Sequence, residues 1–171
     1  FFQLTPEGVA RPARALCKLD GGGVVRAPDG AAFVRHLGDR VDLHDLASPE
    51  PRASVPALRH ERVLPVGRRV VLVDHERVRL VGPTGELLAE HTRPGGYTGV
   101  PLPSPSGHLV AFVHPLGRWD GGPTIELLDL RSGRTRGVTT TEPPARFGWS
   151  PSGRMLLSFS AGRAATLLAA R

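Results

Sequence analysis

A serine flanked by glycines in the stretch GWSPSG, residues 148–153, is the first candidate for chemistry. Serine nucleophiles of α/β-hydrolases sit in a G-x-S-x-G elbow between a strand and a helix. Here the second glycine comes one residue later, Pro151 lacks the backbone N–H that would stabilise an oxyanion, and a strand-like apolar run follows. We therefore interpret Ser150 as a turn residue and predict a noncatalytic chain.

Histidines are the next candidates, because imidazole serves both proton transfer and metal binding. The chain has seven: His36, His44, His60, His75, His91, His108 and His114. They form no H-E-x-x-H or similar ligand spacing, and the single Cys17 excludes an intrachain disulfide and a cysteine metal cluster. His36, His75 and His114 do recur at the end of an apolar segment, which in a ring would place them on one face. We attribute this recurrence to a sequence repeat, and predict neither a metal site nor a cofactor.

The repeat is visible around four glycines. The segments are RAPDGAAFVRH around Gly30, VLPVGRRVVLVDH around Gly67, LPSPSGHLVAFVH around Gly107 and GWSPSGRMLLSF around Gly153. Each has a short strand, a proline two residues before the glycine, and then a mostly apolar run. The glycines recur every forty residues or so, which indicates a repeat architecture with variable loops.

A second hairpin follows in the first three copies. The stretches 41–55, 78–92 and 125–139 each read as strand, tight turn and strand, with turn sequences such as Pro83-Thr84-Gly85 and Arg131-Ser132-Gly133. One copy is therefore four antiparallel strands. Twenty-one glycines, seventeen prolines and few aromatic residues agree with many turns and short strands.

Burial can be predicted from the apolar pattern of these strands. The second strands, such as 70–73 and 109–113, are apolar at consecutive positions. Because successive side chains of a strand point to opposite faces, these strands must be covered on both sides. The third strands alternate instead, as Val41 and Leu43 do with Asp42 and His44, which favours a place nearer the rim. Four-stranded sheets stacked face to face around an axis form a β-propeller, and the alternatives are a β-sandwich or a mixed α+β domain.

The motifs SPSGHLVAFV, IELLDLRSGRTRGVT and WSPSGRMLLSF resemble the blades of TolB-type and WD-repeat-like bacterial β-propellers. The resemblance covers residues 24–159 and is weakest in the second copy, where PVG replaces the turn. It implies an all-β propeller fold and a scaffold, gating or ligand-platform role. Trp119-Asp120 precedes the third strand of its copy, so it is not the WD dipeptide that ends the third strand of WD repeats.

The copies predict blades at 24–56, 57–92 and 93–141, and a partial blade at 142–171. Residues 1–23 would be outer strands of a preceding or ring-closing blade: FFQLT could supply the missing fourth strand of the last copy. The other interpretation, which we favour, is a part of a larger propeller that needs further blades or a partner.

Loops between the second and third strands emerge on the same face as the loops between blades. This face would carry the residue types that dominate interface energies: the predicted binding residues are Arg93, Tyr97, Arg118, Trp119, Asp120 and Arg146. They come from three loops, 92–98, 114–124 and 139–147. Trp119 could equally fold back to cap its own blade.

A noncatalytic scaffold that binds a protein or peptide on this loop face is the function we expect. The first alternative is the gating propeller of a serine hydrolase or peptidase whose catalytic domain lies outside this chain. The second is nucleic-acid binding, suggested by a net charge of +6 but disfavoured because the arginines are dispersed and interleaved with acids. The skewed composition, with Lys18 the single lysine and no asparagine, is typical of a GC-rich genome. No apolar run reaches the roughly 18 residues of a membrane span.

Overall fold

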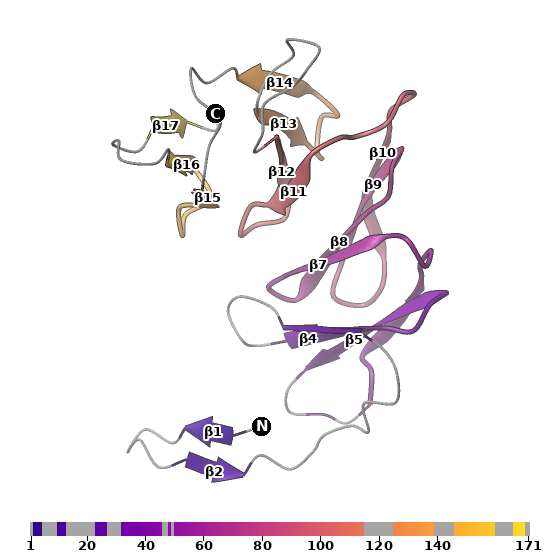
Figure 1. The fold of residues 1–171 in the computed structure, drawn as a ribbon. Helices are drawn as coiled ribbons and strands as arrows, with labels where there is room; N and C mark the ends of the chain where they lie inside the picture. Colours follow the sequence, from indigo (N-terminus) through magenta and orange to yellow (C-terminus); the bar gives the residue numbers. More distant parts are fainter. Residues whose placement is uncertain are drawn as a thin grey trace.

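The computed structural model describes residues 2–4, 10–12, 23–26, 32–45, 48, 50–114, 125–138, 146–159 and 166–169. Every regular element in these ranges is a β-strand, and the strands form small antiparallel sheets that follow one another along the chain (Figure 1). The all-β class is thereby confirmed. Among these same residues there is no helix of the length and apolarity needed to cross a lipid bilayer.

Three sheets have four strands each, joined in chain order as meanders. Sheet I contains β3 (Gly23–Arg26), β4 (Ala32–His36), β5 (Arg40–Asp45) and β6 (Ala53–Pro56). Sheet II contains β7 (Arg62–Val66), β8 (Arg69–Val73), β9 (Arg77–Val81) and β10 (Leu87–Thr92). Sheet III contains β11 (Val100–Pro103), β12 (Leu109–Val113), β13 (Ile125–Asp129) and β14 (Thr135–Val138).

Sheet IV has three strands, β15 (Arg146–Trp149), β16 (Met155–Phe159) and β17 (Thr166–Ala169). A separate hairpin is made of β1 (Phe2–Leu4) and β2 (Ala10–Pro12), with Phe2 opposite Pro12. Strand β1, which lies within FFQLT, pairs with β2 in this hairpin.

In the second, third and fourth copies of the repeat, the glycine closes the turn between the first and second strands, whereas Gly30 of the first copy lies outside the described residues. Gly67, Gly107 and Gly153 have φ values of +57°, +74° and +67°, a region that side-chain-bearing residues avoid. In the third copy the Gly107 N–H donates to the Ser104 carbonyl at 2.8 Å, and Gly153 donates to Ser150 at the same distance. The proline-glycine signal of the repeat thus marks a hairpin turn.

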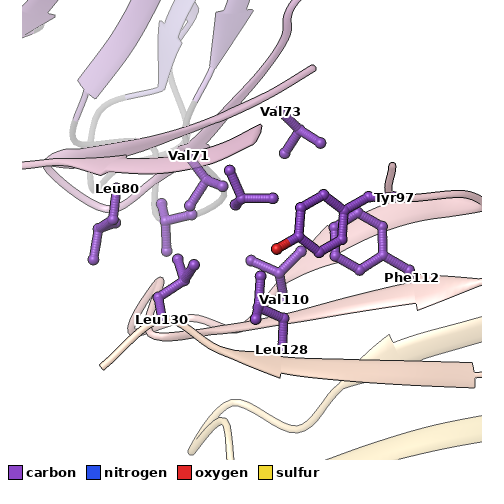
Figure 2. Close-up of a cluster of buried hydrophobic side chains, with 10 residues drawn as sticks. Val71, Val73, Leu80, Tyr97, Val110, Phe112, Leu128 and Leu130 are labelled. Carbon is purple, nitrogen blue, oxygen red and sulfur yellow. The ribbon is translucent and has the colours of Figure 1, made fainter. Parts of the chain in front are cut away.

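The second strands are covered on both faces, as their sequences predict. On β8, Val70 and Leu72 pack against sheet I, whereas Val71 and Val73 pack against sheet III. Strand β12 repeats the arrangement: its alternate residues join a cluster with sheet II or with sheet IV. Figure 2 shows the cluster between sheets II and III. Each pair of neighbouring sheets therefore shares one apolar interface.

The third strands differ from the expectation of a half-exposed rim. Asp42 and His44 on β5 are only 5% and 3% exposed. The Asp42 carboxylate accepts a hydrogen bond of 2.6 Å from Ser54, and the His44 ring stacks on Phe33 with 4.6 Å between centroids. Asp42 thus has a hydrogen-bond partner within its own sheet, whereas among the described residues neither ring nitrogen of His44 has one and only the stacking on Phe33 accompanies its burial.

Candidate functional site

The loop 93–99 joins β10 to β11 and rests on the turn 74–76 between β8 and β9. The Arg93 N–H donates to the Glu76 carbonyl at 2.8 Å, and the Tyr97 N–H donates to the His75 carbonyl at 2.6 Å. Gly96 has a φ of +82°, and a Cβ there would lie 2.2 Å from the His75 ring. An inter-sheet loop and a loop between second and third strands therefore lie together, as expected; we call this end of the sheets the loop face.

Tyr97 connects this loop to the core. It is 8% exposed, and its ring stacks on Phe112 with 4.9 Å between centroids (Figure 2). The Arg93 guanidinium lies 5.8 Å from the centre of the Tyr97 ring. Burial raises the pKa of the Tyr97 hydroxyl, although the nearby Arg93 opposes the shift. Tyr97 thus forms a wall of the loop face more than a protruding contact.

Glu126 fixes the other end of the loop. The Arg93 guanidinium donates to the Glu126 carboxylate, whose side chain is 8% exposed, whereas the Arg93 side chain is 40% exposed. A buried carboxylate that has lost water needs such a partner. The sequence analysis did not single out Glu126. Its position inside the apolar run IELL could have indicated a buried carboxylate that needs a partner.

A hollow of about 270 Å³ opens beside Tyr97, and its lining includes His60, Arg62, His75, Pro101 and Phe112. An adjoining hollow of about 390 Å³ shares His60, Asp74 and His75 with it. Both His60 and His75 are exposed. The smaller hollow combines the aromatic walls of Tyr97 and Phe112 with cationic or hydrogen-bonding groups, a combination suited to binding and not specific to one reaction. The larger hollow is lined by polar and charged side chains. His60, Arg62 and His75 were not among the predicted binding residues.

Asp74 is occupied by its own turn. Its carboxylate accepts the N–H groups of Glu76 and Arg77 at 2.8 and 2.7 Å. Partial burial pushes the pKa of Asp74 up, but these hydrogen bonds and the Arg77 charge outweigh it and lower the pKa. Asp74 therefore stays ionised and shapes the turn.

The chain matches no known family model and no curated protein.

The six predicted binding residues have different outcomes. Arg93 and Tyr97 come together on the loop face. Arg118, Trp119 and Asp120 lie outside the described residues. Arg146 is the first residue of β15, paired with Phe159, so the strand starts before the expected end of that loop at Phe147.

Two of the three recurring histidines pack on the same loop. His75 lies beside Gly96, and His114 lies beside Gly99, where a Cβ would be 3.1 Å from the His114 ring. His36, at the end of β4, belongs to sheet I. Within the described ranges no three His, Cys, Asp or Glu side chains gather into a group that could hold a metal ion.

Ser150 lies in a turn that Ser104 duplicates. The Ser150 hydroxyl accepts the Met155 N–H at 3.2 Å and lies 3.1 Å from the Ser152 hydroxyl. Ser104 accepts the Leu109 N–H at 3.2 Å in the same way. Both serines are buried. The turn interpretation of GWSPSG is confirmed.

Proposed function

We propose that sheets I to IV are successive blades of a β-propeller, of the TolB-type or WD-repeat-like kind that the repeat resembles. Two observations support this. Each sheet is a meander with the same strand order, and the three neighbouring pairs each share an apolar interface. A sandwich has two layers, whereas four sheets stack here, and the regular elements of the described residues include no helix for an α+β fold.

We further propose that the chain is a noncatalytic scaffold that binds a protein or peptide segment at the loop face. The observation that carries this proposal is the anchoring of loop 93–99. Two backbone hydrogen bonds, the Arg93–Glu126 ion pair and the Tyr97–Phe112 stack hold it in one place. A surface that is already ordered loses little conformational entropy when a partner binds, so more of the contact energy appears as affinity.

The residues that line the hollow would supply the contacts. His60 and His75 can donate and accept hydrogen bonds, Arg62 brings a planar cation, and Tyr97 brings an aromatic wall. Trp119, which lies outside the described residues and which the sequence predicts on the same face, would add a large apolar surface. Arg93 and Glu126 act indirectly in this scheme, because they hold the loop.

A selection of random displayed peptides on the immobilised protein tests the proposal. Affinities of selected peptides would be measured by fluorescence anisotropy for the wild type, His75→Ala and Trp119→Ala. We expect losses of about tenfold, the scale of one good interface contact, with an unchanged thermal transition. Arg68→Ala, in the turn at the opposite end of sheet II, is the matched control and should bind like the wild type.

The outcomes separate the possibilities. Peptides whose affinity is the same for His75→Ala and Trp119→Ala, or which lose affinity only with Arg68→Ala, would refute recognition at the loop face. Unfolding of Trp119→Ala would show that Trp119 caps its own sheet, and His75→Ala would then decide alone. Failure to select any peptide above background would also contradict the proposal.

A further inference from the structure

Another hollow, distinct from the two at the loop face, lies at the opposite end of sheet III. Its volume is about 440 Å³, and it is lined by Leu109, Leu127, Asp129, Ser132, Arg134 and Arg136, together with Thr135. The turn between β13 and β14 borders it. Leu127 also joins the apolar cluster that packs on Leu156 of sheet IV, so the hollow opens on the side of sheet III that faces sheet IV.

Two arginines give this hollow its charge. Arg134 and Arg136 are exposed, and neither takes part in the ion pairs found among the described residues. The one carboxylate in the lining, Asp129, is held by its own turn: it accepts the Arg131 N–H at 2.8 Å and the Ser132 hydroxyl at 3.0 Å. Two guanidinium groups therefore border the hollow without a neutralising partner in the described ranges.

The corresponding rim between sheets I and II is already neutralised. Asp45, the last residue of β5 as Asp129 is of β13, pairs with Arg52 and, at 3.0 Å, with Arg68 of sheet II. Arg52 also donates to the Pro83 carbonyl at 2.9 Å. The arginines at the rim between sheets I and II are thus paired within the protein. Arg134 and Arg136, at the rim of sheet III, have no ion-pair partner among the described residues.

The floor of the hollow is apolar. Leu127 is 7% exposed and Leu109 is partly buried. A bare inorganic anion would pair with the arginines but gain nothing from these leucines. A segment that places a carboxylate beside an apolar side chain satisfies both, because arginine binds carboxylates through two parallel hydrogen bonds.

We propose that this hollow is a second binding site, which takes an acidic peptide segment. Glu or Asp side chains of the segment pair with Arg134 and Arg136, and an adjacent apolar side chain packs on Leu109 and Leu127. The site lies at the other end of the sheets from the loop face, so it is independent of recognition there.

The test uses a capped, fluorescein-labelled octapeptide of alternating glutamate and leucine, with a matched glutamine and leucine peptide. Arg134→Glu and Arg136→Glu should each weaken binding of the acidic peptide by about tenfold or more, since a charge-assisted pair becomes a repulsion. Arg59→Glu makes the same charge change at an exposed position of the loop face and should stay close to the wild type. Circular dichroism and the thermal transition report on folding.

Nuclear magnetic resonance of the ¹⁵N-labelled wild type gives a second measurement that needs no variant. The acidic peptide should shift the amide signals of Ser132 and Thr135 and leave those of Tyr97 and Gly99 in place. Three results would overturn the proposal: equal affinity for the glutamine peptide, an equal loss with Arg59→Glu, or shifts confined to the loop face. If inorganic phosphate, which binds weakly, displaced the acidic peptide completely, the hollow would be a site for small anions. That result would also overturn the proposal.

Discussion

Arg79 and Glu126 occupy the same position in successive sheets and carry opposite charges. Arg79 lies opposite Leu72 in sheet II, and Glu126 lies opposite Phe112 in sheet III, where Leu72 and Phe112 are each five residues beyond the turn glycine. Each pairs with a residue of the connection that enters its own sheet: Arg79 with Glu61 at 2.8 Å, and Glu126 with Arg93. The same ion pair, with its polarity reversed, therefore fastens two successive connections.

Replacing Arg79 with alanine should destabilise the protein strongly. The Glu61 side chain is completely buried, and Arg79 donates to both of its carboxylate oxygens. Without Arg79 the buried Glu61 carboxylate keeps, among the described residues, only the Leu58 N–H as a hydrogen-bond donor. Leaving a buried charge without its ion-pair partner costs about 3–5 kcal/mol. Urea unfolding would measure the loss.

Two variants calibrate this value. Arg77→Ala on the same strand removes ion pairs in which the arginine side chain is one-third exposed, and it should cost about 0.2–1 kcal/mol. Arg93→Ala should fall between them, at about 1–3 kcal/mol, because water reaches the Arg93 side. If Arg79→Ala lowered the free energy of unfolding no more than Arg77→Ala does, the buried pair with Glu61 would contribute no more than an exposed ion pair.

His44 should make the protein less stable in mild acid. Burial lowers the pKa of His44, with smaller opposing contributions from Asp42 and Glu50 and reinforcing ones from Arg35 and Arg52. In the unfolded chain a histidine titrates near 6.5. As the pH falls through that value the unfolded state binds the proton first, so the free energy of unfolding declines and levels off only below the folded-state pKa.

Urea unfolding between pH 7.5 and 5 would measure this decline for the wild type and for His44→Leu. The decline should be smaller in the variant. His108, whose pKa is lowered by burial and by Arg131 and Arg69, remains in both proteins and supplies a shared background. Parallel curves for the two proteins would show that His44 takes no part.

Alanine at Gly107 should cost more than alanine at Gly95. Both glycines have positive φ values, +74° and +84°, so both substitutions incur backbone strain of about 1–2 kcal/mol. At Gly107 the new Cβ would also lie 3.0 Å from the buried Leu80 side chain, whereas Gly95 faces open space. Thermal unfolding would give the difference, and equal effects would mean that sheet II yields to the added methyl group.

Removing the Ser150 and Ser104 hydroxyls should have the same effect. Each hydroxyl accepts one backbone N–H in the same kind of turn, so Ser150→Ala and Ser104→Ala should each cost about 0.5–1.5 kcal/mol in unfolding experiments. A fluorophosphonate probe should label neither serine. Selective labelling that disappears in Ser150→Ala would instead identify a nucleophile.

The apolar runs and the turn residues were enough to predict the strands that are covered on both faces and the hairpin turns between strands. Val70 to Val73 are apolar without interruption, which demands two covered faces, and the structure supplies a sheet on each side. The glycines at 67, 107 and 153 required positive φ values, and they have them. Both inferences rest on local geometry, so a single sequence was sufficient.

The charged positions could not be predicted in the same way. Asp42, Arg79 and Glu126 stand at one register position, opposite Arg35, Leu72 and Phe112. The sign of the charge at this position differs from copy to copy, because the partner comes from a different place in each copy. Asp42 pairs with Arg40 of its own strand, whereas Arg79 and Glu126 pair with residues of connections of variable length. Alternation in the third strands therefore suggested exposure. Asp42 and Glu126 are instead buried, the Arg79 side chain is only 15% exposed, and each has an oppositely charged partner nearby.

Strand β8 belongs to two apolar interfaces at once, through alternate residues. A strand shared in this way couples each interface to the next, and among the described residues each apolar cluster joins neighbouring sheets. Unfolding should then follow the statistics of a one-dimensional array with nearest-neighbour coupling. Truncation of Val71 should weaken the interface between sheets II and III first, and truncation of Leu72 should weaken the interface between sheets I and II first. Comparing the two variants would show how far the loss of one interface affects the unfolding of the other sheets.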